Sequence, residues 1–95
     1  MLWTVRLSPE AEKQLSRPPR DIQQQIGSAI DQICRDPFQG NVKPLKGKVW
    51  KGRFRKRAGR YRLIFIPDYS NRMIEISQIL ARSDKDLPVA IDSVL

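Results

Sequence analysis

The sequence contains no histidine and only one cysteine, Cys34. A Ser/His/Asp triad, a Cys/His pair and most zinc sites all need an imidazole, so hydrolases of these types are excluded. A single cysteine cannot form an internal disulfide or hold a metal by itself, which agrees with a reducing compartment. Because Cys34 lies at the margin of an apolar helical stripe, we expect a small buried hydrophobe rather than a reactive thiol.

Long apolar runs are also missing. No stretch approaches the roughly 20 apolar residues of a membrane-spanning helix, which excludes a transmembrane protein. The N-terminal stretch MLWTVRLSPEAEKQL has no basic segment followed by a long apolar one and no small-residue cleavage site. We therefore expect no secretion signal and a cytoplasmic location. A length of 95 residues with 40% apolar content predicts a single domain over residues 1–95.

Acidic residues are absent between Pro37 and Pro67. That segment holds ten basic residues: Lys43, Lys46, Lys48, Lys51, Arg53, Arg55, Lys56, Arg57, Arg60 and Arg62. The remaining residues carry 8 basic and 10 acidic side chains, so the net charge of +8 comes entirely from this segment. A charge run is usually a solvated face. Its confinement here favours a surface for a polyanionic partner, either a nucleic acid or an acidic protein.

The N-terminal part of the chain predicts a strand followed by two helices. Residues 2–7 (LWTVRL) are apolar and β-branched enough for a strand, and Ser8-Pro9-Glu10 provides a helix cap, a proline for the first helical position and an early acid. This first helix should end near Ser16, because Pro18-Pro19 cannot lie inside it. The second helix carries its apolar residues within about a 100° arc: Ile22, Ile26, Ala29, Ile30 and Ile33.

The remainder predicts a loop and an antiparallel β-meander. Asp36-Pro37 should stop the second helix, and FQGNVKPLKGK should be a loop. Strands are expected over 49–57 and 60–67, joined at Ala58-Gly59, and over 72–80 after a turn at 68–71. This order predicts an α+β fold with the helices packed on one face of an antiparallel sheet. The tail over 81–95 is expected either to be anchored by Ala90, Ile91 and Leu95 or to be loosely attached.

Strand alternation predicts what lies on the uncovered face of the sheet. In the first strand of the meander Arg53, Arg55 and Arg57 share a side, opposite Trp50 and Phe54. In the second strand Arg60 and Arg62 lie opposite Tyr61, Leu63 and Phe65. The arginines should therefore gather on the open face, although a bulge at Gly52 would change the parity of Lys51 and Arg53.

Five sequence pieces in order carry a family resemblance: SPEAEKQL after the first strand, a helix ending in DP, LKG, FRKRAGRYRLIF and ILARSDKDL. Together they resemble the RelE/ParE superfamily of bacterial type II toxins over nearly the whole chain. The short helices and the LKG…RxGxYRLIF passage are more similar to the RelE messenger-RNA endoribonuclease branch than to the gyrase-poisoning ParE branch. The resemblance implies a RelE-like fold and a toxin kept silent by an acidic antitoxin.

The resemblance also implies a chemistry and a set of site residues. Members of the RelE branch cut messenger RNA in the ribosomal decoding site, where the 2′-hydroxyl attacks the adjacent phosphate without a metal or other cofactor. By the family pattern, the catalytic arginines fall on Arg62 and Arg82, and a basic pair that is often lysine falls on Arg53 and Arg55. The expected RNA-binding residues are Lys46, Lys48, Lys51, Lys56, Arg57, Arg60 and Lys85.

Two departures from the family pattern concern proton transfer. Arginine keeps its proton to a pKa above roughly 12 and is a poor general base, so Lys51 or Lys56 would have to substitute. The C-terminal tail reads DKDLP where many active members have a Tyr or His. Slow cleavage supported by orientation and electrostatics, and replacement by Glu75, Tyr61 or Lys85, are both open. Tyr61 shares its parity with core residues.

Loss of cleavage is the third reading of these departures. The chain would then be a non-cleaving gyrase inhibitor of the ParE type, or a nucleic-acid-binding relative. Trp3 and Trp50 are expected to lie in the core or to contact the antitoxin rather than to stack on bases, because RNA-binding aromatics usually come as exposed clusters.

Overall fold

Capping fixes the start of the first helix. In the computed structural model, which describes residues 2–40, 42–48 and 50–81, strand β1 (Thr4–Leu7) leads into helix α1 (Pro9–Ser16). The Ser8 hydroxyl accepts a hydrogen bond from the Ala11 N–H at 3.0 Å and donates one to the Ser77 carbonyl at 2.7 Å. Ser8 therefore caps α1 and ties it to the last strand, and the predicted helix boundaries are confirmed.

Helix α2 (Arg20–Arg35) follows the predicted stripe. Ile26, Ala29 and Ile33 are buried, and the flanking Ile22 and Ile30 are half-buried against the same core. Pro19 occupies the N-cap position, and the helix ends before Asp36 as the sequence predicts. The amphipathic pattern thus places one face of α2 on the sheet.

Within the described residues the sheet has five strands, in the order β1-β5-β4-β3-β2. The added elements are β2 (Val42–Pro44), β3 (Phe54–Ala58), β4 (Tyr61–Asp68) and β5 (Met73–Ala81). The β3-β4-β5 meander is antiparallel, as predicted. The prediction of a fully antiparallel sheet was wrong, because β1 pairs with β5 in parallel. Side-chain alternation reports which face a strand buries and carries no information on its direction.

The connection between α2 and β3 also differs from its prediction. The expected loop contains β2, which pairs with β3 through Val42↔Lys56, Lys43↔Arg55 and Pro44↔Phe54. The strand predicted from residue 49 begins only at Phe54. Gly47 and Gly52 adopt positive φ values of 104° and 79°, which turn the chain and postpone the strand.

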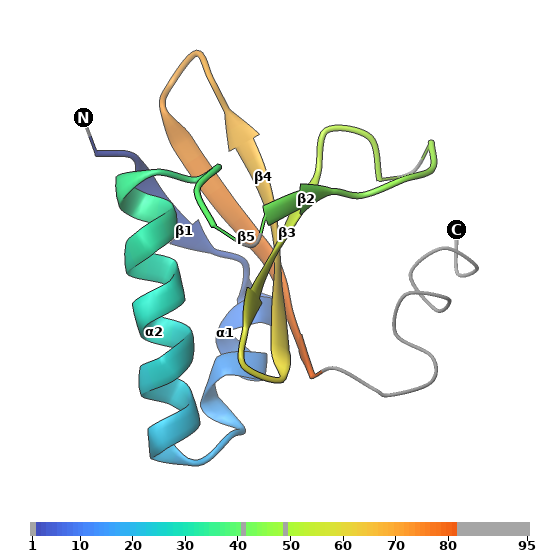
Figure 1. Ribbon diagram of the computed structural model, residues 1–95. Helices are drawn as coiled ribbons and strands as arrows, with labels where there is room; N and C mark the ends of the chain where they lie inside the picture. The colour runs from blue at the N-terminus through green and yellow to red at the C-terminus, as the bar shows by residue number, and fades with distance from the viewer. Residues whose placement is uncertain (1, 41, 49, 82–95) are drawn as a thin grey trace.

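Both helices lie on one side of the sheet, and a loop between β2 and β3 stands on the other (Figure 1). The main core fills the space between helices and sheet. It consists of Ala11, Ile26, Ala29, Ile33, Ala58, Leu63, Phe65, Ile74, Ile76 and Ile79. We call this the covered face of the sheet, and the opposite side the open face. The predicted packing of the helices on one sheet face is confirmed.

A bulge in β5 keeps its isoleucines in this core. Ile64 pairs with Gln78 and Phe65 pairs with Ile76, so Ser77 is the extra residue. Ile74 and Ile76 precede the bulge and Ile79 follows it, and all three are buried on the covered face. The bulge reverses the parity of the strand and sends Gln78 and Leu80 to the open face.

Within the described ranges, neither helix is long and apolar enough to cross a membrane. The predicted anchors Ala90, Ile91 and Leu95 lie outside the described residues.

Candidate nucleic-acid interface

A tight hairpin between β3 and β4 carries the central arginines. Ala58 pairs with Tyr61, which leaves Gly59 and Arg60 as a two-residue turn. Gly59 has a φ of 60°, as the first central position of a type II′ turn requires. A Cβ at Gly59 would also lie 2.6 Å from the Gln25 side-chain oxygen on α2. Glycine therefore lets the hairpin twist tightly and pack closely on the helix.

Three arginines share the open face, as the alternation predicts. In the register, Arg57 pairs with Arg62 and Arg55 pairs with Ile64, while Lys56, Ala58 and Leu63 point to the covered face. We call Arg55, Arg57 and Arg62 the arginine cluster. Like charges directly opposite on neighbouring strands destabilise a sheet. Anionic phosphates bound along the cluster would offset that repulsion, so the cluster is suited to an RNA backbone.

The members of the cluster differ in burial. The Arg62 side chain is only 4% exposed, Arg55 is half-buried and Arg57 is exposed. A guanidinium held at a buried position has little rotamer freedom left to lose when an anion binds. Arg62 is thus the buried member of the cluster and Arg57 its exposed neighbour.

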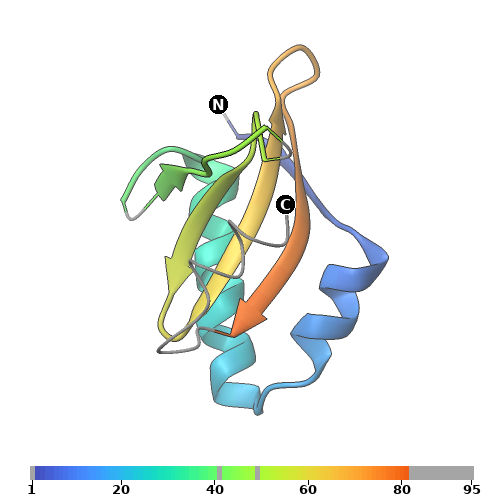
Figure 2. The same ribbon diagram turned by 90° about the vertical axis from the view of Figure 1, so that its right-hand side faces the viewer.

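The loop between β2 and β3 folds back over the open face (Figure 2). Its Trp50 is 7% exposed and packs in a second apolar cluster with Ile64, Leu45 and Leu80. The Leu45 N–H donates to the Arg53 carbonyl at 2.9 Å and closes the loop at its base. The expectation of an uncovered face is therefore corrected, since this loop covers part of it.

Trp50 lies on the side opposite to the one that alternation predicts. The strand pattern placed it with Phe54 on the covered face, but it packs on Ile64 of the open face. The positive φ of Gly52 breaks the alternation between residues 50 and 54. The Arg53 guanidinium stacks over Trp50, with Cζ 5.4 Å from the ring centroid. Arg53 thus stands on the rim of the open face rather than within the arginine cluster.

The remaining basic residues fall into two positions. Lys46, Lys48 and Lys51 are exposed on the loop, and Arg60 is exposed at the tip of the β3–β4 hairpin. The loop that carries the three lysines stands on the side of the sheet opposite the helices, the side of the arginine cluster (Figures 1 and 2). The loop therefore adds positive charge beside the cluster without contributing to its geometry.

Lys56 is placed where it cannot join the interface. It points to the covered face, is 4% exposed, and its ammonium donates to the Gln39 carbonyl at 3.3 Å. Burial lowers the pKa of Lys56, and the nearby Asp36 carboxylate partly opposes this. The expectations that Lys56 binds RNA or replaces the missing base are corrected. Alternation along β3 sets it between two outward arginines.

Neither Tyr61 nor Glu75 lies beside Arg62 on the open face. Tyr61 is half-buried against the main core, so it belongs to the covered face as its parity indicates. Glu75 pairs with Ile66, four residues along β4 from Arg62. Four residues of strand span about 13 Å, which is beyond the reach of a shared phosphate. Tyr61 and Glu75 therefore do not stand beside a phosphate bound at Arg62.

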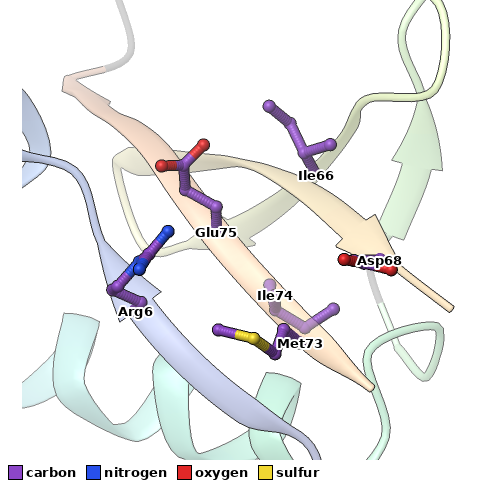
Figure 3. Close-up of a pocket in the computed structure, with 6 residues that line it drawn as sticks. All are labelled: Arg6, Ile66, Asp68, Met73, Ile74 and Glu75. Carbon is purple, nitrogen blue, oxygen red and sulfur yellow. The ribbon is translucent and has the colours of Figure 1, made fainter. Parts of the chain in front are cut away.

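The other end of the open face has a different character (Figure 3). An open pocket of about 210 Å³ is lined by Arg6, Ile66, Asp68, Met73, Ile74 and Glu75. Figure 3 shows Arg6 and Glu75 rising from neighbouring strands, where they are register partners, with the apolar side chains around them. The mixed charge makes this end unsuited to a polyanion.

Two predicted site residues, Arg82 and Lys85, lie outside the described residues. Sequence reasoning missed two features of the open face. Gln78 and Leu80 reach it only because of the β5 bulge, and Trp50 reaches it because of a glycine turn. The one sequence signal for the second was Gly52 itself, which indicated a shift of register near Arg53.

The two-helix, five-strand arrangement with a basic open face is that of a small type II toxin. Residues 5–85 match the model of the ParE toxin family of type II toxin–antitoxin systems. The chain belongs to this family, within the RelE/ParE superfamily. No curated protein matches the sequence.

Solved structures support the same assignment. The RelBE2 toxin–antitoxin complex of Mycobacterium tuberculosis matches with a TM-score of 0.77 and 28% identity, over 86% of this chain and 100% of that one. The archaeal RelE–RelB complex of Pyrococcus horikoshii matches with a TM-score of 0.73 and 21% identity, over 88% and 99% of the two chains. The isolated Escherichia coli RelE toxin gives 0.73 and 12% identity, over 98% and 99%. The last two similarities show the fold alone.

Proposed function

We propose that this toxin is a metal-independent endoribonuclease that cuts messenger RNA on the ribosome. The observation that carries the proposal is the arginine cluster. Arg57 and Arg62 are opposite each other on the open face, and Arg55 lies two residues before Arg57 on the same face of β3. The resemblance of the LKG…RxGxYRLIF passage to the RelE messenger-RNA endoribonuclease branch supports RNA as the polyanion. The cluster makes backbone contacts and carries little sequence preference of its own.

In the proposed reaction, the 2′-oxygen of one nucleotide forms a bond to the adjacent phosphorus and the bond from phosphorus to the 5′-oxygen breaks. The 2′-hydroxyl proton passes to a base, and the leaving 5′-oxygen takes up a proton. Negative charge grows on the phosphate oxygens in the transition state. Arg62 and Arg55 stabilise that charge with paired N–H donors, and Arg57 with the loop lysines holds the flanking backbone.

The proposal assigns charge stabilisation, not proton transfer, to the described residues. Arginine keeps its proton, and Tyr61, Lys56 and Glu75 all lie away from Arg62. The rate then depends on the orientation of the RNA in the decoding site and on electrostatic stabilisation, both of which lower a barrier without a strong base. Arg82 and Lys85 remain proposed members of the site.

We also propose a cytoplasmic location and an acidic antitoxin as partner. A segment with ten positive charges and no acidic residue would bind RNA indiscriminately if it were left exposed. The structural relatives include toxin–antitoxin complexes. An acidic protein laid on the arginine cluster would neutralise this charge and block the RNA.

The proposal is tested by inducible expression in a bacterial host. Growth should stop within a generation, and mapping of RNA 5′ ends should reveal new ends inside translated codons. A strain expressing Arg62→Ala provides the matched control. Growth arrest without new ends would mean that messenger RNA is not the target.

A second candidate is a toxin that inhibits gyrase without chemistry. The match to the ParE family model favours it, as does the placement of Tyr61 and Glu75 away from the arginine cluster. A supercoiling assay with purified gyrase separates the candidates. Inhibition at equimolar toxin supports the second, and unchanged supercoiling at a tenfold excess removes it.

A further inference from the structure

Aromatic rings from three separate parts of the chain meet at the end of the sheet opposite the β3–β4 hairpin. Trp3 precedes β1, Phe38 follows α2 and Tyr69 lies in the β4–β5 turn. Phe38 and Tyr69 are stacked with centroids 6.1 Å apart and an interplanar angle of 12°. Trp3 meets them edge-on at 6.5 and 6.0 Å, and Arg72 Cζ lies 4.9 Å from the Trp3 ring centroid. We call these four residues the aromatic patch.

Two rings of the patch are exposed, and hydrogen bonds close the turn that carries one of them. Phe38 is 43% and Tyr69 62% exposed. The Tyr69 turn is closed by Asn71, whose backbone N–H and side-chain amide donate to the Asp68 carboxylate at 3.3 and 2.9 Å. These bonds hold the pKa of Asp68 below its usual range. The patch is thus presented with little ordering entropy left to lose on binding.

Trp3 and Phe38 are anchored to the end of α2. The Trp3 N–H donates to the Cys34 carbonyl at 2.7 Å, and the Cys34 thiol donates to the Trp3 carbonyl at 2.9 Å. The Phe38 N–H donates to the Asp36 side chain at 3.1 Å. Exposed aromatic side chains next to an arginine, held in one geometry, are the composition of binding hot spots in protein interfaces.

The surroundings of the patch favour a protein over a nucleic acid. The neighbouring pocket presents Asp68 and Glu75 with one cation, Arg6. The carboxylates would repel phosphates, whereas Arg57 and Arg62 of the arginine cluster lie next to the β3–β4 hairpin. The proposed phosphate site and the patch are therefore separated along the sheet.

The patch is also too small to hold a second copy of this chain by itself. With roughly 150–250 Å² per aromatic side chain, the exposed parts of Phe38 and Tyr69 offer on the order of 200 Å². A stable dimer needs about 800 Å² from each partner. A partner that binds the patch must therefore contact the protein at a second site as well. An acidic protein attracted to the cationic segment would make such a second contact.

We propose that the aromatic patch is a second anchor point for the antitoxin, on which an apolar side chain of that partner packs against Phe38 and Tyr69. This inference rests on the antitoxin partner of the proposed function. Phe38 also contacts Phe54 of β3 at 5.3 Å, and Lys43 of β2 pairs with Arg55 of the arginine cluster. One extended segment can cover both regions, since about 11 extended residues span the 37 Å longest dimension of the molecule.

One ionic and one apolar contact region would together make antitoxin binding less sensitive to salt. Contacts to the arginine cluster weaken as salt shortens the screening length to about 3 Å at 1 M. Apolar contacts to the patch persist under those conditions. An antitoxin displaced from the arginine cluster would thus stay attached at the other end of the sheet.

The test takes as its probe a small acidic protein identified from a neighbouring reading frame. Its binding to the purified full-length toxin is measured by titration calorimetry at about 0.1 M and about 1 M salt. Tyr69→Ser and Phe38→Ser should each weaken binding about 30-fold at both salt concentrations, as loss of a hot spot does. Ser70→Ala, in the same turn, should bind as the wild type does. Arg57→Ala should weaken binding at low salt only.

Fluorescence gives a second readout that does not depend on affinity. In a Trp50→Phe background, Trp3 is the remaining tryptophan, and its emission should shift to the blue when the antitoxin covers the patch. Thermal melting confirms that each variant is folded. Tyr69→Ser, at the most exposed position of the patch, should remain as toxic as the wild type and need more antitoxin for neutralisation.

Several outcomes would overturn the proposal. Wild-type affinity in both patch variants, or no binding of the acidic protein to the wild type, would do so. A Trp3 shift caused by a single-stranded RNA oligonucleotide would assign the patch to RNA, and concentration-dependent dimerisation lost in Tyr69→Ser would assign it to a second copy. The titration does not require RNA cleavage. A toxin that binds the antitoxin through the patch but cuts no RNA would refute the proposed function alone.

Discussion

The two faces of the β3–β4 hairpin show how one stretch of basic sequence is divided by geometry. On the open face, Arg55, Arg57 and Arg62 form a cluster beside the loop whose Trp50 packs on Ile64. On the covered face, the neighbouring Lys56 is buried with a lowered pKa. All four are cations within a few residues of one another. Their positions in the strand, rather than their charge, separate a binding surface from a structural residue.

The comparison predicts that the covered face governs stability. Phe65 is fully buried in the main core, beside Leu63 and stacked at 5.8 Å on Phe54. Phe65→Ala should lower the free energy of unfolding by about 3–5 kcal/mol, because it leaves a cavity in a packed core. Chemical denaturation measures this loss. Phe65→Leu, which removes fewer atoms from the same site, should lose less, and similar losses in both would show that the core is loosely packed.

The open face should govern activity. Arg62→Ala should reduce messenger-RNA cleavage about 10²–10³-fold, the loss that follows removal of one donor to a developing negative charge. Arg62→Lys keeps the charge without the paired donors and should recover only part of the rate. Single-turnover cleavage on purified ribosomes measures both variants. Equal rates for lysine and arginine at this position would show that charge alone suffices.

The turn that joins β3 and β4 should be sensitive to the addition of a single methyl group at Gly59. Gly59→Ala should destabilise the fold by about 1–2 kcal/mol, because the turn needs a positive φ that alanine resists. The added methyl also meets the Gln25 side chain. The double variant Gly59→Ala/Gln25→Ala separates the causes in denaturation experiments. Full recovery in the double variant would attribute the effect to the contact rather than to the backbone.

Of the four substitutions, replacement of Lys56 should have the smallest effect, and it tests whether this residue belongs to the covered face. Lys56→Met should leave toxicity unchanged, since the side chain is buried on the covered face, where its ammonium donates to the Gln39 carbonyl. Because burial lowers the pKa of Lys56 below 10.5, the folded protein releases this proton at lower pH than the unfolded chain does. The contribution of Lys56 to the free energy of unfolding of the wild type should therefore increase as pH rises from the folded pKa to 10.5.

The methionine variant should lose that contribution to the pH dependence. Denaturation at a series of pH values up to about 10 compares the two proteins. Reduced toxicity in Lys56→Met, with the fold intact, would place Lys56 in the working surface after all.

Helices were predictable from the sequence because their signals are local. The Ser8 cap and the stripe that includes Ile26 and Ile33 each depend on spacing within a few turns. The outward parity of Arg55, Arg57 and Arg62 followed equally from simple alternation. These features needed no knowledge of which strands pair.

Long-range features could not be predicted, because they depend on which distant segments of the chain pair. The parallel pairing of β1 with β5 depends on where the helices return the chain, and the bulge at Ser77 depends on the need to bury Ile79 beside Leu63. Trp50 reached the open face through glycine turns whose direction alternation does not specify. In the candidate site, the roles of Arg53, Arg55, Arg62 and Arg82 came from the family resemblance and remain proposals.

The most direct test of the proposed function is RNA 5′-end mapping in cells that express either the wild-type toxin or Arg62→Ala at equal levels. The proposed role of the open face predicts new ends within translated codons for the wild type and their loss for the variant, with both proteins folded. Growth arrest by the wild type without new ends, or the same ends from both proteins, would contradict it.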